Sequence, residues 1–219
     1  MRIRNLILVV FLISVAVPAL AWTHGRRVRV KSTPSRPQFD LVVEGGIAEP
    51  LGDLADDFVG TQKGMGAATG WEVGGRLRYY LSPTTSVGPA VHYTDFGDWD
   101  DFDVDTPYSV RTQILRVGVD IQQFLAPRGD PVRPYITLGV SLCHNTYEDW
   151  METAGTYTTS SNNLGLSAGG GLAMGPFELS ALWTYNPVQD RNLPLGQGAL
   201  DDEFDWNYLV VRAGIAFGG

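Results

Sequence analysis

Eight ionisable side chains stand out because each falls on a strand-like segment, on the face that otherwise carries small or polar residues. Four are acidic and four are basic, so their formal charges cancel. They are Glu44, Glu72, Asp120, Glu178, Arg76, Arg78, Arg116 and Arg212. Two facing carboxylates could act as the acid and base of a glycosidase. The neighbouring arginines favour buried ion pairs instead, because an isolated buried charge is costly.

A second group of charged residues is an acidic run that contains no base. Six aspartates lie between Asp95 and Asp105. Hard divalent cations prefer such oxygen ligands, and the candidate ligands in this run are Asp98, Asp100, Asp101 and Asp103. The run resembles the start of a calcium loop but lacks its glycine and its terminal glutamate. The pattern favours the alternative, a solvated acidic loop.

Segments with period-two alternation of apolar residues must position these side chains. The expected strands cover residues 39–48, 69–81, 85–94, 109–125, 134–144, 162–174, 177–185 and 204–217. On the fourth and fifth of them, Val117 and Leu138 lie on the apolar face. Each segment is long enough for a tilted membrane strand, which needs ~9–11 residues.

The connections between these segments alternate in length. Long ones cover residues 49–68, 95–108, 145–161 and 186–203, and short ones cover 82–84, 126–133 and 175–176. Long loops on one side and short turns on the other are typical of a membrane β-barrel. A soluble, lipocalin-like barrel is the competing fold, and it would place the apolar face inside.

Aromatic residues gather at both ends of the expected strands, which predicts two girdles at the lipid–water interfaces. The outer girdle would contain Trp71, Tyr93, Phe96, Tyr147, Trp150, Trp183, Tyr185 and Trp206. The other would contain Phe39, Tyr79, Phe124, Tyr135, Phe177 and Phe217.

The N-terminal region has a different character. Residues 1–21 have a charged start, an apolar run and an A-x-A site, which predicts a cleaved secretory signal. Its removal takes away two arginines and changes the net charge from −8 to −10, a balance that does not suit a nucleic acid partner. Residues 22–38 are basic and contain two prolines, which predicts a flexible tail. The single cysteine, Cys143, excludes an internal disulfide.

The last strand alternates cleanly, with Val211, Ile215 and Phe217 on its apolar face. A closing strand of this kind resembles that of the small eight-stranded outer-membrane β-barrels, similar to the transmembrane domain of outer membrane protein A. The chain departs from that pattern in two places. Gly218 and Gly219 follow the terminal aromatic, and Arg212 stands where the motif has glycine.

The resemblance implies an all-β fold, an eight-stranded antiparallel up-and-down transmembrane barrel over residues 39–217. It implies a place in the bacterial outer membrane with both termini in the periplasm. The expected partners are then outer-membrane lipid, lipopolysaccharide and the barrel-assembly machinery that reads the closing strand, with a divalent cation at the acidic run as a further candidate.

Some small barrels modify lipid A with Ser and His near the outer rim, which makes an enzyme one alternative. The sequence His92-Tyr93-Thr94 has Thr where a His-x-Ser pattern needs Ser, and we assign no catalytic residue and no cofactor. We expect a non-catalytic barrel with a structural or surface-interaction role through acidic extracellular loops. A narrow solute or ion channel is the other alternative. The surface ligand stays open, because loops diverge freely on a common barrel.

Overall fold

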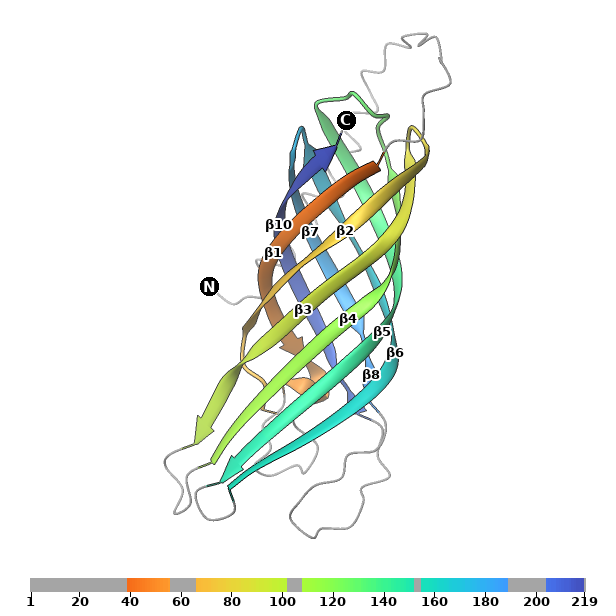
Figure 1. Ribbon diagram of the computed structural model, residues 1–219. Helices are drawn as coiled ribbons and strands as arrows, with labels where there is room; N and C mark the ends of the chain where they lie inside the picture. The colour runs from red at the N-terminus through yellow and green to blue at the C-terminus, as the bar shows by residue number, and fades with distance from the viewer. Residues whose placement is uncertain (1–38, 56–65, 102–107, 152–154, 189–203, 219) are drawn as a thin grey trace.

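A computed structural model describes residues 39–55, 66–101, 108–151, 155–188 and 204–218. The long strands within these ranges are β1 (Phe39–Leu51), β2 (Gly70–Ser82), β3 (Thr85–Asp101), β4 (Tyr108–Phe124), β5 (Val132–Met151), β6 (Gly155–Met174), β7 (Phe177–Tyr185) and β10 (Asn207–Gly218). These eight strands close an antiparallel barrel in the order β1-β10-β7-β6-β5-β4-β3-β2 (Figure 1). The predicted fold class is therefore confirmed.

Shorter elements lie at one end of the barrel. A 3-10 turn, η2 (Gly52–Leu54), follows β1, and β8 (Pro187–Val188) pairs with β9 (Phe204–Asp205). We call this the loop end. The other end, where β1 begins and β10 finishes, is the terminal end (Figure 1). Among the described residues, no helix is long and apolar enough to cross a membrane.

The alternation of each strand places apolar side chains outside and polar ones inside. Leu138 on β5 is 61% exposed, whereas Glu44 on β1 is 3% exposed. A soluble barrel has the opposite arrangement, so this distribution excludes the lipocalin-like alternative. An outward apolar belt needs a lipid environment, because exposing such a large apolar surface to water is unfavourable.

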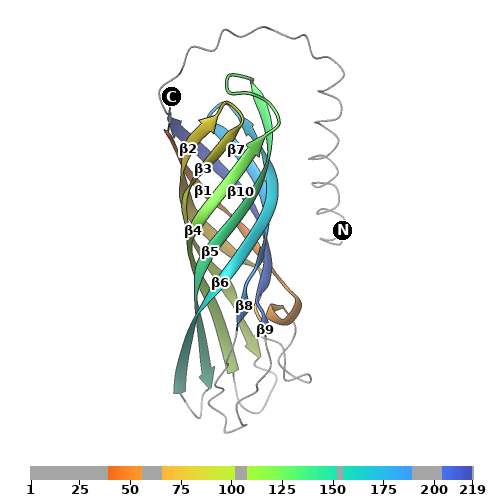
Figure 2. The same cartoon turned by 90° about the vertical axis from the view of Figure 1, so that its right-hand side faces the viewer.

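Strands β3 to β6 run further toward the loop end than their neighbours do (Figure 2). The β2–β3 pairing stops at Trp71 and Asp95 while β3 continues to Asp101. The β6–β7 pairing stops at Leu166 and Tyr185 while β6 begins at Gly155. The described residues of the expected loops, 95–101, 108, 145–151 and 155–161, are therefore strand, which corrects the sequence prediction. The apolar alternation ends at the edge of the belt, but backbone pairing continues through polar residues.

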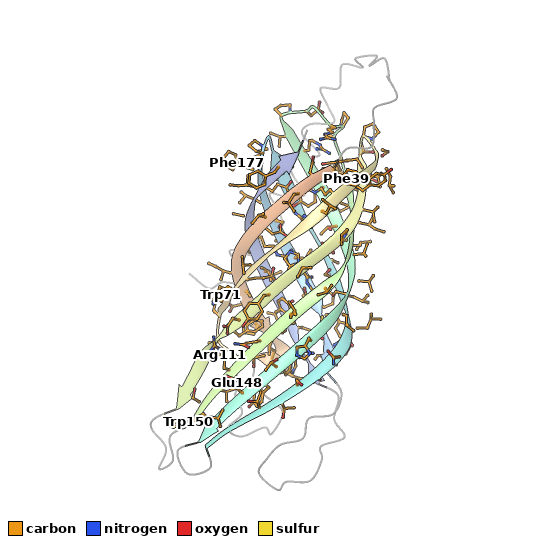
Figure 3. The ribbon with its side chains drawn as sticks, viewed as in Figure 1. Phe39, Trp71, Arg111, Glu148, Trp150 and Phe177 are labelled. Carbon is orange, nitrogen blue, oxygen red and sulfur yellow. The ribbon has the colours of Figure 1, made fainter. Side chains whose placement is uncertain are left out.

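The two expected aromatic girdles are only partly present. Figure 3 shows Phe39 and Phe177 at the terminal end and Trp71 and Trp150 toward the loop end, and all four side chains are exposed. Five other aromatics are buried, which corrects their assignment to the girdles. They are Phe96, Phe124, Tyr135, Tyr147 and Trp206. The four in barrel strands have the parity of the inward face, so the period of two decides where these rings lie, whatever their position along the strand.

The belt generates a test of the membrane assignment. Leu138→Arg puts a charge on the lipid face and should lower the free energy of unfolding in lipid vesicles by about 2–4 kcal/mol. Ser160→Arg is the matched control, since Ser160 is an exposed β6 residue in the extension beyond the belt, and its effect should be small. Denaturant titration of both variants measures the difference. Equal effects at the two positions would contradict the assignment.

Candidate functional site: the barrel interior

The interior has three layers, and the first is an apolar layer at the loop end. It consists of Ala48, Leu54, Ala67, Phe96, Val110, Ile114, Cys143, Tyr147, Trp206, Tyr208 and Val210. Phe96 and Tyr208 meet edge to face with ring centroids 5.5 Å apart. Leu54 comes from η2, so the 3-10 turn contributes a buried side chain to this layer. Side chains at interior density leave little room for water here.

The middle layer is a chain of ion pairs that links six of the eight charged residues. Arg78 pairs with Glu178, and Glu178 also lies 3.0 Å from Arg76. Arg76 Nη2 is 3.1 Å from Glu44 Oε2. Glu44 in turn lies 3.4 Å from Arg212 Nη1.

The chain ends at Glu72, whose Oε1 is 2.5 Å from Arg212 Nε. Acids and bases therefore alternate from Arg78 to Glu72, and each of these side chains is nearly fully buried. Three acids face three bases, so the chain is neutral. Because desolvation is expensive, such a set is stable only while every member keeps its partners.

His92 joins this chain although the sequence did not identify it as a member. Its Nε2 lies 2.7 Å from Glu44 Oε1, and its Nδ1 lies 3.1 Å from Arg116 Nη2. A guanidinium can only donate hydrogen bonds, so Nδ1 is the acceptor and the Nε2 proton is donated to Glu44. Arg116 reaches the ion-pair chain through this ring, and its Nη1 is 3.4 Å from Thr184 Oγ1.

Asp120 differs from the other seven charged residues. It is 8% exposed, and it makes no ion pair in the described part of the chain. Its Oδ2 atom is buried without a hydrogen-bond partner. Gly139 on β5 makes room for the carboxylate, since a Cβ there would lie 2.3 Å from Asp120 Oδ1. All eight predicted residues thus lie inside the barrel, but Asp120 stands apart from the chain of ion pairs.

The third layer, at the terminal end, stacks arginines on aromatic rings. Phe124 contacts two arginines, with ring centroid to Cζ distances of 5.5 Å for Arg78 and 3.9 Å for Arg133. Tyr135 is 5.2 Å from Phe124 between centroids, and its hydroxyl accepts a hydrogen bond from Arg76 Nη2 at 3.2 Å. Such cation–π contacts strengthen when they are removed from water.

One wall of the lumen is lined by small residues, and this wall accepts the long side chains. Strand β6 turns Gly165, Ser167, Gly169 and Gly171 inward. A Cβ on Gly171 would lie 2.7 Å from the hydroxyl oxygen of Tyr135. The absence of a side chain at this position therefore allows the ring of Tyr135 to reach its arginine partners.

The described part of the acidic run lies at the loop end. Asp95, Asp98, Asp100 and Asp101 belong to β3, so they are strand residues rather than loop residues. Asp103 lies outside the described residues, as do the side chains of Asp98, Asp100 and Asp101. Asp95 is buried on the outer side, where Arg111 Nε donates to its Oδ1 at 3.1 Å. Within the described residues, no cluster of three or more His, Cys, Asp or Glu side chains could hold a metal ion.

No protein-family model matches the sequence, and no curated protein matches it. The structure is, however, similar to solved structures. The chain is similar to Ail, the attachment invasion locus protein of Yersinia pestis, with 15% identity over 84% of this chain and 100% of that chain and a TM-score of 0.51. It is also similar to Neisserial surface protein A, with 16% identity over 81% and 95% of the two chains and a TM-score of 0.47.

A third similar structure is a major outer membrane protein from Thermus thermophilus, with 14% identity over 83% and 99% of the two chains and a TM-score of 0.48. At these sequence identities the similarity shows the fold alone. The fold assignment rests on Ail, whose TM-score is above 0.5. The fold is that of a small outer-membrane β-barrel, so the resemblance to this type is confirmed at the level of the fold.

The ion-pair chain predicts that the buried acids contribute unequally to the free energy of unfolding. Glu44→Gln weakens contacts to Arg76, Arg212 and His92 at once, and it should lower the free energy of unfolding by about 3–5 kcal/mol. Combining it with Arg76→Gln should recover part of the loss, because Arg212 keeps Glu72 and Glu178 keeps Arg78.

Asp120→Asn is the matched control for this double-mutant cycle, as it neutralises a lumen acid that has no ion pair among the described residues. Its effect should be clearly smaller than that of Glu44→Gln. Denaturant unfolding in detergent micelles measures the unchanged protein and all three variants. If Glu44→Gln and Asp120→Asn had equal effects, the ion-pair chain would have no special role in stability.

Proposed function

We propose that the protein is a non-catalytic barrel of the bacterial outer membrane whose lumen is sealed and whose role is structural or surface-interacting. In this proposal both termini lie in the periplasm, and the loop end faces outward. Lipid and lipopolysaccharide surround the belt, and the barrel-assembly machinery inserts it. The strand extensions and the segments between them then form the surface offered to a partner.

The observation that carries this proposal is the continuity of the filled interior. The apolar layer, the ion-pair chain and the arginine–aromatic layer follow one another along the lumen, and their members are buried. An eight-stranded barrel is just wide enough for side chains to fill it. This filling supports a sealed barrel, which acts through its outer surface.

The environment of the two described histidines supports a non-catalytic role. His92 is 1% exposed, and both of its ring nitrogens are engaged by Glu44 and Arg116, so neither is free to take a proton from a substrate. His144 points outward and lies 2.9 Å from Asn162 Oδ1. A general base must reach the substrate proton directly or through one water, and His92 is not placed to do so.

Bilayer recordings test the sealed lumen against the channel alternative. The purified protein should show no steady conductance in planar bilayers. Glu44→Gln should admit water and conduct weakly, because the arginines it leaves short of partners attract solvent. Steady conductance of the unchanged protein would establish the channel instead, and a silent Glu44→Gln variant with unchanged melting would contradict the sealing role of the network.

The acidic run generates a separate prediction about the outer surface. If Asp98, Asp100, Asp101 and Asp103 gather around a divalent cation, millimolar calcium should slow proteolysis of the adjoining segment. Replacing the four with Asn should remove the protection, and magnesium should give less of it because it demands a stricter geometry. If the cleavage rate of the unchanged protein does not depend on calcium, the run is a solvated acidic surface.

A further inference from the structure

The terminal end of the lumen contains a cation without a counterion among the described residues. Arginines and aromatic rings alternate from the centre of the barrel to this end, in the order Arg76, Tyr135, Arg78, Phe124, Arg133, Tyr80 and Arg128. Arg76 and Arg78 are neutralised by Glu44 and Glu178. Arg128 lies 3.0 Å from Asp40. Arg133 has no acid within ion-pair distance in the described part of the chain, although it is only 8% exposed.

The unmet hydrogen bonds of Arg133 lie on one edge of its guanidinium. Nε and Nη2 are both buried without an acceptor. These two N–H groups point the same way and match two oxygens of one oxyanion, the geometry that gives bidentate binding. Stacking on Phe124 contributes attraction but no acceptor, so the cost of two buried charged donors is not met by protein groups within the described residues.

The surroundings of Arg133 favour an anion. Arg128 Nη2 is paired with Asp40, and the hydroxyl of Tyr80 donates to the same carboxylate at 2.7 Å. The backbone holds this arrangement in place, because Arg128 N donates to Pro83 O at 3.1 Å and so joins two turns. The guanidinium groups of Arg128 and Arg133 both lie against the ring of Tyr80, and Arg133 makes no ion pair within the described residues.

The height of the site along the barrel indicates the chemical class of the anion. Leu125 and Val132 flank the turn that carries Arg128, and their side chains are 55% and 42% exposed on the outer face. The apolar belt therefore ends at the level of Arg133. Phospholipid headgroups, which carry phosphodiesters, lie at this level, and so does the adjoining water, in which inorganic phosphate dissolves.

We propose that Arg133, assisted by Arg128, binds a phosphate-class oxyanion at the terminal end of the barrel. The anion is either free phosphate or the phosphodiester of a lipid headgroup. Its oxygens meet the Nε and Nη2 edge after the guanidinium turns out from under the rings, a movement that the flexible arginine side chain allows. This site is distinct from the sealed central layer, so it does not depend on the proposed surface role.

Two titrations of the full-length protein in non-ionic micelles test the site and separate the two sources. One adds inorganic phosphate against chloride at matched ionic strength. The other mixes phosphatidylglycerol into the micelles, with the corresponding diacylglycerol as the phosphate-free control. The readouts are the melting temperature and the NMR resonance of the Arg133 Nε–H group. At least one probe should shift that resonance saturably and raise the melting temperature.

Two variants identify the residue responsible. Arg133→Gln should weaken binding at least about tenfold, because it removes the charge-assisted bidentate contact. Arg111→Gln is the matched control, an arginine on the outer surface near the other end, and it should leave binding unchanged.

The responses to the two probes either identify the source of the anion or overturn the proposal. A response to phosphate alone assigns a free oxyanion, and a response to phosphatidylglycerol alone assigns a headgroup. No response to either probe, or equal binding by Arg133→Gln, would overturn the proposal. If Arg133→Gln does not fold, the Nε titration of the unchanged protein decides, since that edge has no other partner among the described residues.

Discussion

Closure of the backbone hydrogen-bond ladder is the constraint on which the other features depend. A strand in lipid has no water to satisfy its N–H and C=O groups, so each strand must pair on both sides and the sheet must close. In a closed sheet every second side chain points into a narrow lumen. The charges of β1, β2, β7 and β10 are thereby forced into one volume, where they stabilise one another as alternating ion pairs.

The strands and their facing could be predicted from the sequence, because one rule decides them. Period two assigns Leu138 to lipid and Glu44 to the lumen, and the structure has both as expected. The fold class followed from the same rule and from the alternating loop lengths. The ends of β3, β5 and β6 could not be predicted this way, because polar strands beyond the belt carry no apolar signal.

The partners inside the barrel were predictable only between neighbouring strands. Glu44 with Arg76 and with Arg212 follows from strand adjacency, and both contacts are present. The contacts of Glu178 with Arg76 and Arg78 cross the lumen from β7 to β2, and no pattern along the chain encodes such a distance. His92 and Tyr135 were missed as members for a simpler reason. Both have the parity of the inward face, but a histidine near a hydroxyl also fits a catalytic base, and a tyrosine near a strand end also fits an interfacial aromatic.

The position of Arg212 links the order of events in folding to the finished interior. It lies on the last barrel strand, and its two partners lie on the first and second, so its ion pairs cross the β1–β10 seam. While the seam is open, Glu72 lacks its ion pair with Arg212, and Glu44 keeps Arg76 but lacks Arg212. The pairing of β1 with β10 is therefore the step that brings Arg212 to the acids at the centre of the barrel. A half-closed sheet would leave these acids without their arginine partners, so we expect partial closure to be disfavoured and the seam to close cooperatively.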